Sequence, residues 1–301
     1  MKSKIVSMFV ALIAATCAAT AFAQRDFSKV VIKTTQLAPN FYALDGDGGT
    51  IGILTGPDGV LMVDSQFAPL SERIFAAIKQ ISDGRIRYLI NTHLHGDHVG
   101  GNENMAKAGA VIFARHNLRA RLAKQGIQSN GVPNVPAPPL ALPAVTYDAP
   151  TVINANGEAV QLISVPAAHT DGDTMVFFPK ANVLMTGDFY RSLGYPNIDR
   201  NNGGSIAGML AGFEAILKLT SADTKIVPGH GAVVDKSAVA AHRDIMIAVR
   251  DKLAALVKDG KTLDEALAAK LTADFDAKVP GAADTSARFI TQMYADLKAA
   301  R

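Results

Sequence analysis

The sequence predicts an α/β fold made of two units, each running from strands to helices. Three observations indicate this class: apolar runs of strand length recur from residue 27 onward, five prolines in 131–143 interrupt the chain near its midpoint, and helical spacing follows the strands in both halves. Because an apolar sheet face must be covered by another layer, we expect the two sheets to pack together with helices outside. The chain has 301 residues, 49% of them hydrophobic, which is enough for a substantial core.

The first residues predict an export signal. Lys2 and Lys4 precede an apolar run over 5–15, and Ala21-Phe22-Ala23 supplies small residues before a cleavage site. We therefore expect a signal peptide at 1–23 and a periplasmic mature protein that makes no membrane contact. A retained anchor is the alternative, although the apolar run is short for a membrane span.

Cys17 is the only cysteine and falls within this leader, so the mature chain is expected to have no disulfide and no thiolate ligand. The preceding Ala14-Ala15-Thr16 is a poor lipobox, which favours soluble export over a lipoprotein. Loss of Lys2 and Lys4 lowers the formal net charge from +3 to +1. That balance gives no electrostatic reason to expect nucleic acid as a partner.

The first half begins as an antiparallel meander. Strands are expected at 30–32, 41–44, 50–54 and 60–63, with turns rich in Asp and Gly at 45–49 and 56–59. The turn at 45–49 lacks the glutamate of a calcium loop and the lysine of a phosphate cradle. We therefore interpret it as a flexible hairpin tip.

Helices and strands then alternate. Residues 69–82 carry apolar side chains at the spacing of one helical face and lead into an apolar strand at 86–90. The remaining elements expected in this half are a helix at 102–109, a strand at 110–113 and a helix at 117–124.

The second half repeats the pattern. Strands are expected at 160–165, 174–178, 183–185 and 225–227, and helices at 205–219 and 237–257. The alanine-rich end is helical in spacing and carries one apolar stripe, Phe289, Met293 and Leu297, which is typical of core or of a dimer contact. We therefore expect one domain at 24–258 and a helical extension at 259–301 packed on it, in a monomer or a dimer.

Residues 91–101, Asn-Thr-His-Leu-His-Gly-Asp-His-Val-Gly-Gly, carry the main functional signal. Imidazole nitrogen and carboxylate oxygen are ligands that suit zinc. Neighbouring residues cannot all reach one ion, so the simplest arrangement gives His93 and His95 to one ion and Asp97 and His98 to a second. A polar loop with a few buried histidines would not need this density of ligands.

Three further candidates, His169, Asp188 and His230, each follow an apolar strand. The carboxyl ends of neighbouring strands share one edge of a sheet, so these side chains can meet in one cleft. Each signal is weak alone, since a single histidine after a strand is usually structural. Only His116 and His242 fall outside the set, and we assign them no chemistry.

Together these motifs resemble the metallo-β-lactamase superfamily, whose hallmark is His-x-His-x-Asp-His followed by a later His, an Asp or Cys, and a last His. The resemblance covers about residues 27–250 and implies a four-layer αβ/βα sandwich with two zinc ions per chain. The ligand sets that it implies are His93, His95 and His169 for one zinc and Asp97, His98 and His230 for the other, with Asp188 bridging the ions or completing the second set.

Two positions differ from the cysteine-bearing β-lactamases. Asp188 stands in place of their thiolate, as in glyoxalase II and many general hydrolases of the superfamily. Arg191, three residues later, stands in place of the lysine that holds the drug's carboxylate, and its guanidinium offers a two-pronged donor. A solvated loop arginine is the equally plain alternative for Arg191.

The implied chemistry is hydrolysis by a hydroxide shared between two metal ions. We assign the catalytic role to Asp97, which can orient the nucleophile, and substrate contact to Arg191 and to Tyr190 or Tyr195. Two further carboxylates, Asp64 and Asp173, are candidate partners for ligand imidazoles, or else turn residues.

Export and near-neutral charge argue against glyoxalase II and the tRNA-processing nucleases. We expect a small substrate that bears a carboxylate, with β-lactam hydrolysis first, as a main or a side activity. A lactone, thioester or other ester hydrolase is the alternative. A non-catalytic periplasmic metal-binding or redox-relay protein is the alternative of another class, although the redox branch carries a glutamate where this chain has His95.

Overall fold

The computed structural model describes residues 26–127 and 135–299. The predicted signal peptide at 1–23 lies outside these ranges, as does part of the proline-rich stretch. No helix within them is both long and apolar enough to cross a membrane.

A seven-stranded sheet forms the first half. Its strands are β1 (Lys33–Ala38), β2 (Phe41–Asp45), β3 (Ile51–Leu54), β4 (Val60–Val63), β5 (Ile86–Ile90), β6 (Val111–Arg115) and β7 (Val145–Tyr147). They lie in chain order, antiparallel from β1 to β4 and parallel from β4 to β7. The meander predicted at the start of the chain therefore continues into a parallel sheet.

A five-stranded sheet forms the second half. Its strands are β8 (Thr151–Ala155), β9 (Glu158–Ser164), β10 (Thr174–Phe178), β11 (Val183–Met185) and β12 (Lys225–Val227). Their order is β12-β11-β10-β9-β8, and the only parallel pair within it is β11 with β12. Consequently β9, β11 and β12 point the same way and end at one edge.

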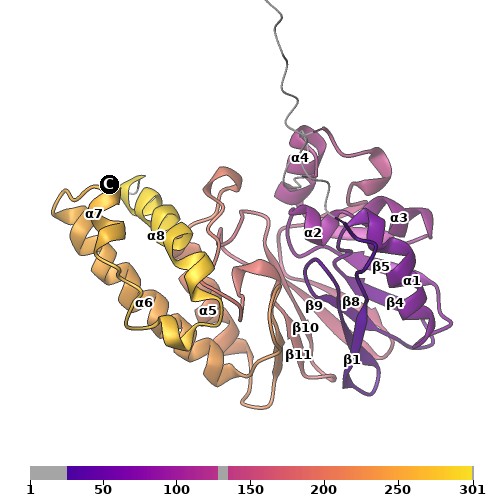
Figure 1. Ribbon diagram of the computed structural model, residues 1–301. Helices are drawn as coiled ribbons and strands as arrows, with labels where there is room; N and C mark the ends of the chain where they lie inside the picture. The colour runs from indigo at the N-terminus through magenta and orange to yellow at the C-terminus, as the bar shows by residue number, and fades with distance from the viewer. Residues whose placement is uncertain (1–25, 128–134, 300–301) are drawn as a thin grey trace, which may run out of the picture.

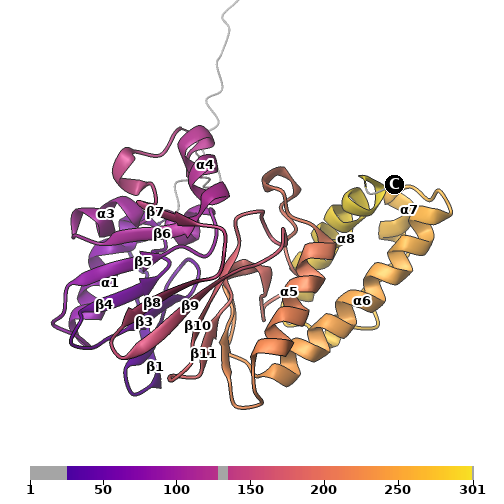
Figure 2. The ribbon, with the colours of Figure 1, turned by 180° about the vertical axis from the view of Figure 1, so that it is seen from behind.

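Helices cover the outer face of each sheet, as Figures 1 and 2 show. The helices beside the first sheet are α1 (Ser71–Lys79), α3 (Asn102–Lys107) and α4 (His116–Gln125), and those beside the second are α5 (Ile206–Leu219), α6 (Lys236–Lys258), α7 (Leu263–Ala268) and α8 (Ala282–Ala299). Between the sheets, the rings of Phe41 and Phe178 lie 4.6 Å apart, and Gly52 lies against Met185. The four-layer αβ/βα sandwich predicted from the sequence is confirmed.

The C-terminal extension packs on the second sheet's helices. Phe289 and Met293 are fully buried in the same apolar cluster as Phe213 of α5, and Leu297 packs partly against that cluster. The apolar stripe noted in the sequence is therefore core, and α8 becomes part of the outer helical layer (Figure 1).

Some strands differ from those expected. The apolar run at 30–32 is not a strand, and Val31 is 80% exposed; the strand is β1, whose Lys33 pairs with Asp45. An apolar run shows which side chains can be buried, whereas a strand requires a backbone partner. The strands β7 and β8 were not expected because neither carries a continuous apolar run.

Candidate metal centre

The candidate ligands stand where strands end. β5 leads into 91–101, which contains the one-turn helix α2 (Gly96–Val99), while β9 leads to His169, β11 to Asp188 and β12 to His230. Since β9, β11 and β12 end at one edge, the loops after them face the loop after β5 across the sheet interface.

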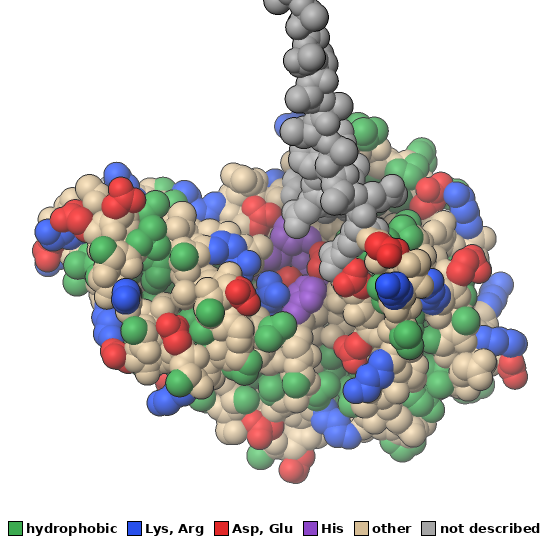
Figure 3. Space-filling view, in the orientation of Figure 1, with side chains coloured by type: hydrophobic (Ala, Val, Ile, Leu, Met, Phe, Trp, Pro, Cys, Tyr) green, Lys and Arg blue, Asp and Glu red, His purple; other side chains and the backbone are tan. Residues whose placement is uncertain are grey.

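The structure brings all seven predicted ligands together in three overlapping groups. Within each group, one ligand atom per residue lies within 4.8 Å of the others. The groups are His93, His95 and His169; His93, His98 and Asp188; and Asp97, His98 and His230. Figure 3 shows histidines at the floor of a hollow between the two halves of the molecule, with acidic and basic side chains around them.

The first group, which we name the histidine trio, aims three ring nitrogens at one point. Nδ1 of His95 lies 2.9 Å from Nε2 of His169, and Nε2 of His93 is buried with no hydrogen-bond partner in the described part of the chain. Burial and the neighbouring imidazoles lower the pKa of His93 well below its usual range and that of His169 to about 4. These rings are therefore neutral at pH 7, which is the state that binds metal.

The outer nitrogens of the trio are held by the protein. Nδ1 of His169 donates to the carbonyl oxygen of Asn197 at 2.6 Å, and Nε2 of His95 lies 2.8 Å from Oδ2 of Asp199. Such a contact fixes the tautomer and leaves the other ring nitrogen free for a ligand role. Sequence reasoning missed Asn197 and Asp199, because they follow no strand and act across the fold.

The remaining ligands form a carboxylate-rich set, defined as Asp97, His98, Asp188 and His230. Oδ1 of Asp188 lies 3.2 Å from Nε2 of His98 and 3.4 Å from Nε2 of His230, which is 3.1 Å from Oδ2 of Asp97. Burial opposes the charge on Asp188, but the facing imidazoles hold its pKa well below the usual range. The carboxylate of Asp188 chiefly raises the pKa of His230, to about 9.

These atoms fit a bound cation. Nε2 of His93, Nε2 of His98 and Oδ1 of Asp188 are buried, and none forms a well-directed hydrogen bond within 26–127 and 135–299, although the last two atoms face each other at 3.2 Å. A buried polar atom left unpaired is costly, so a convergent set of them indicates a missing positive partner. Nitrogen and carboxylate donors without sulfur are compatible with zinc.

Asp64 supports His98 from behind. Its carboxylate lies 2.7 Å from Nδ1 of His98 and accepts hydrogen bonds from the backbone N–H and hydroxyl of Thr92 at 2.8 and 2.6 Å. It does so from a left-handed backbone conformation with φ of 61°, which is unusual outside glycine. The suggestion that Asp64 partners a ligand imidazole agrees with this geometry.

Asp173 is a turn residue, which is the second of the two roles that the sequence left open for it. Its carboxylate accepts from the backbone N–H groups of His169 and Thr170 at 2.7 and 2.9 Å and contacts no imidazole in the structure's hydrogen bonds. Burial raises its pKa to about 7 against these hydrogen bonds. Asp173 therefore shapes the loop that carries His169 instead of orienting the ring.

The turn at 45–49 packs on the site, which corrects the expectation of a flexible hairpin tip. The N–H of Gly49 donates to the carbonyl of Asp97 at 3.0 Å, and Gln66 donates to the carbonyl of Gly49 at 2.8 Å. A Cβ at Gly49 would lie 2.1 Å from Cε1 of His98. Glycine is needed here because the backbone touches a ligand ring.

The predicted substrate residues separate. Arg191 is half-buried, and its Nε has no hydrogen-bond partner among the described residues. The ring of Tyr190 is 1% exposed and packs against Phe213 and His242 at 5.4 and 5.7 Å, so it lies in the helical layer and not in the cleft. Tyr190 is extended, and successive side chains of an extended segment point to opposite sides.

Tyr195 is also placed away from the cleft. Its ring stacks on Phe289 of α8 at 5.3 Å, and its hydroxyl donates to Asp276 at 2.9 Å. Both tyrosines therefore contribute packing between the second sheet and its helices.

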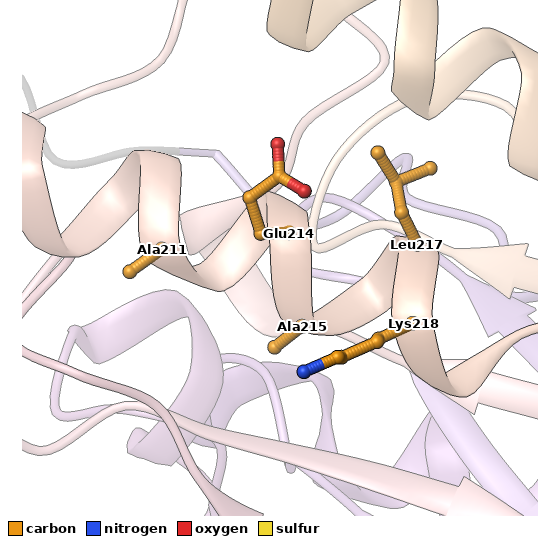
Figure 4. A pocket seen from close by; sticks show the side chains of 5 residues that line it. All are labelled: Ala211, Glu214, Ala215, Leu217 and Lys218. Atoms are coloured by element: carbon orange, nitrogen blue, oxygen red, sulfur yellow. The ribbon is translucent and has the colours of Figure 1, made fainter.

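A separate cavity of about 470 Å³ lies on α5, away from these ligands. Its lining is Ala211, Glu214, Ala215, Leu217 and Lys218, which Figure 4 shows projecting from a single helix. Glu214 is engaged in an ion pair with Arg243 at 2.9 Å. With one paired carboxylate and no histidine, this cavity offers no ligand set.

A family model of the metallo-beta-lactamase superfamily matches residues 44–252. A hydroxyacylglutathione hydrolase from Nitrosococcus oceani is 32% identical over 164 residues, covering 54% of this chain and 55% of that protein. A linear primary-alkylsulfatase from Pseudomonas sp. is 25% identical over 254 residues, covering 71% and 48%. The chain thus spans about half the length of these two curated relatives.

Solved structures share the fold at low identity. A metallo-beta-lactamase from Pontibacter korlensis superposes with a TM-score of 0.61 at 16% identity, covering 71% of this chain and 98% of that one. The sec-alkylsulfatase Pisa1 from Pseudomonas sp. gives 0.67 at 15% identity, covering 88% and 50%. The sandwich is therefore shared with proteins that are named for different activities.

Proposed function

The chain belongs to the metallo-beta-lactamase superfamily of metal-dependent hydrolases, and from that premise we propose that it hydrolyses an acyl bond in a small anionic substrate, using two zinc ions held in the cleft. The observation that carries this proposal is the convergence of seven ligand side chains, three of which (His93, His98 and Asp188) present a buried nitrogen or oxygen atom that forms no well-directed hydrogen bond within 26–127 and 135–299.

The two ligand sets divide the work in this proposal. The histidine trio would hold one zinc, and the carboxylate-rich set, which includes Asp188, would hold the other. Zinc bound by these residues would supply a water of lowered pKa as nucleophile and would polarise the scissile carbonyl.

The chain's own residues do the rest. Asp97, whose side chain is 26% exposed beside His230, accepts a hydrogen bond from the attacking water and orients it. Asp64 and Asp199 keep His98 and His95 in the tautomers that present a free nitrogen inward. The turn at Gly49 packs against the ring of His98, which is fully buried.

For the substrate, we propose β-lactam amide hydrolysis first. Its support is the half-buried guanidinium of Arg191 beside the ligands, which suits a carboxylate next to the scissile bond. A thioester is the second candidate, supported by Asp188 in place of a thiolate and by the likeness to a hydroxyacylglutathione hydrolase.

We further propose that the mature protein acts in the periplasm, as a monomer or dimer, on a free small molecule and without nucleic acid or membrane contact. The support is the leader-like sequence at 1–23 and the near-neutral charge of the remainder. Fractionation of cells followed by N-terminal sequencing tests this, and a cytosolic protein that still begins at Met1 would contradict it.

The function is tested by assaying residues 24–301 against a chromogenic cephalosporin, a glutathione thioester, a homoserine lactone and an alkyl sulfate. We expect close to two zinc equivalents, turnover of the cephalosporin or the thioester, loss of that turnover on chelation and recovery with zinc. Protein that binds two zinc ions yet turns over none of the four would overturn the proposal and favour a metal-binding role without catalysis.

A further inference from the structure

The loop after Asp188 is clamped between two other segments. On one side, the N–H of Ser192 donates to the carbonyl of His230 at 3.1 Å, and its hydroxyl donates to the carbonyl of Ala232 at 2.7 Å. On the other side, the N–H of Tyr195 donates to the hydroxyl of Thr285 in α8 at 2.9 Å. Arg191 therefore sits in a loop that joins the carboxylate-rich set to the C-terminal helix.

Arg288 reaches the same loop from α8. It lies three residues after Thr285 and so projects from the same face of the helix. Its Nη2 donates to the carbonyl of Tyr195 at 3.2 Å. This hydrogen bond holds the guanidinium of Arg288 beside the loop that begins with Arg191.

Electrostatics also place the two arginines together. Arg288 is exposed overall, but its surroundings desolvate the guanidinium, and this desolvation is the main reason that the pKa of Arg288 is lowered. The charge on Arg191 lowers this pKa further, whereas the charge on Asp188 raises it. The two guanidinium groups and Asp188 thus lie within range of one another's charge.

Neither arginine forms an ion pair with a carboxylate within 26–127 and 135–299. Two neighbouring guanidinium groups repel each other, and the carboxylate of Asp188, whose charge also reaches Arg288, is engaged by His98 and His230. Five of the nine other arginines in these ranges form an ion pair with a carboxylate, as Arg121 does with Asp171 at 2.6 Å. The unpaired pair beside the ligands is therefore built for an anion from outside the chain.

We propose that Arg191 and Arg288 form an anion subsite beside the candidate metal centre, and that this subsite binds the carboxylate or sulfate group of the substrate while the neighbouring bond is hydrolysed. The inference rests on the proposed function. It adds a specificity-determining residue from α8, which lies outside the segment 44–252 matched by the family model.

Two guanidinium groups suit this task. Each presents a planar fork of donors, so two of them can engage separate oxygens of a carboxylate or sulfate. Because one arginine comes from the loop and the other from the extension, the subsite exists only when α8 is docked. The extension thereby contributes to substrate choice as well as to the core.

The binding test uses isothermal titration calorimetry of zinc-loaded protein with two probes, sodium sulfate and sodium succinate. We expect Arg288→Ala to weaken binding of at least one probe about tenfold or more, since hydrogen bonds to charged groups are strong. Arg288→Lys should restore part of the affinity. The matched control is Arg250→Ala, which removes a surface arginine of α6 paired with Asp251 at 2.6 Å. Equal affinity in wild type and Arg288→Ala for both probes overturns the subsite.

The kinetic test compares a carboxylate-bearing substrate with its methyl ester. Arg288→Ala should raise KM for the acid about tenfold and leave kcat and the methyl ester nearly unchanged. Equal effects on both substrates would show a structural role and overturn the proposal, with circular dichroism used to confirm folding. If wild type turns over neither compound, the proposed function fails, while the calorimetry still decides whether the arginines bind an anion.

Discussion

The histidine trio and the carboxylate-rich set lie side by side but are prepared for a cation in opposite ways. In the trio, burial keeps His93 and His169 neutral, with pKa values lowered. In the carboxylate-rich set, Asp97 and Asp188 are held ionised, and they raise the pKa values of His98, against burial, and of His230.

The difference shows two routes to one kind of site. In the trio, His93 and His169 are neutral donors, and Asn197 and Asp199 set the orientation of the His169 and His95 rings, so a cation displaces no proton from His93 or His169. The carboxylate-rich set offers charge, so a cation replaces protons on His98 and His230. We therefore expect a mutation in one ligand set to remove the ion bound by that set and to leave the other ion in place.

The largest effect is expected from Asp97, because it both binds metal and orients the nucleophile in the proposed mechanism. Asp97→Ala should lower kcat/KM on the order of 10³-fold or more. The measurement is kcat/KM on whichever substrate the wild type turns over, with circular dichroism to verify the fold. His116→Ala, which removes an exposed histidine outside the cluster, is the control. Near-normal turnover in Asp97→Ala would remove Asp97 from the mechanism.

The next comparison removes one set at a time. His169→Ala should leave the carboxylate-rich set intact, and Asp188→Ala should leave the trio intact. We expect each variant to retain about one zinc equivalent, against two in wild type, because each keeps the donors of only one ion. Elemental analysis after gel filtration gives the count. If either variant loses both ions, the two sets act as a single unit and the division proposed here is wrong.

The sequence allowed the ligands to be predicted because their signal is local. The motif at 91–101 places four donors in one turn. The other three ligands, His169, Asp188 and His230, each follow a strand that can be recognised from its run of apolar residues. The fold class followed from the same alternation of strands and helices. When a ligand directly follows a strand, the strand places it, so residues close in the sequence are enough to predict its position.

Other features depend on contacts between distant segments, and the sequence does not mark them. Asp199 reaches His95 across 104 residues, and Arg288 reaches Tyr195 across 93. The hairpin of β8 and β9 was missed even though Asn156-Gly157 is a turn signal, with φ of 53° and 75° at its two residues. The strand β8 alternates polar and apolar residues and has no continuous apolar run, so the turn was the only strong indication of this hairpin.

A smaller effect is expected when the supporting carboxylates lose charge but keep shape. Asp199→Asn should weaken zinc in the trio, and Asp64→Asn should weaken zinc in the carboxylate-rich set, each about 10- to 100-fold. Competition with a chromogenic chelator measures both affinities. We expect Asp64→Asn to weaken zinc binding more than Asp199→Asn does, because Asp64 also accepts hydrogen bonds from Thr92. Unchanged zinc affinity in Asp199→Asn would show that the charge of Asp199 is not needed to hold the ring of His95.

The smallest effect concerns His242, a buried histidine outside both ligand sets. Burial lowers its pKa to about 4, and its Nε2 has no hydrogen-bond partner in the described ranges. Between about pH 4 and 6.5, the unfolded chain therefore binds a proton at His242 more readily than the native protein does. Protonation favours the unfolded state, so the free energy of unfolding decreases as the pH falls from 6.5 to 4. His242→Leu should remove this dependence, on the order of 1 kcal/mol between pH 7 and 5. Urea unfolding at both pH values, with His116→Leu as control, measures the change. If wild type and His242→Leu lose the same stability between the two pH values, the acid sensitivity comes from other groups. The candidates are then His93 and His169, which burial also keeps neutral.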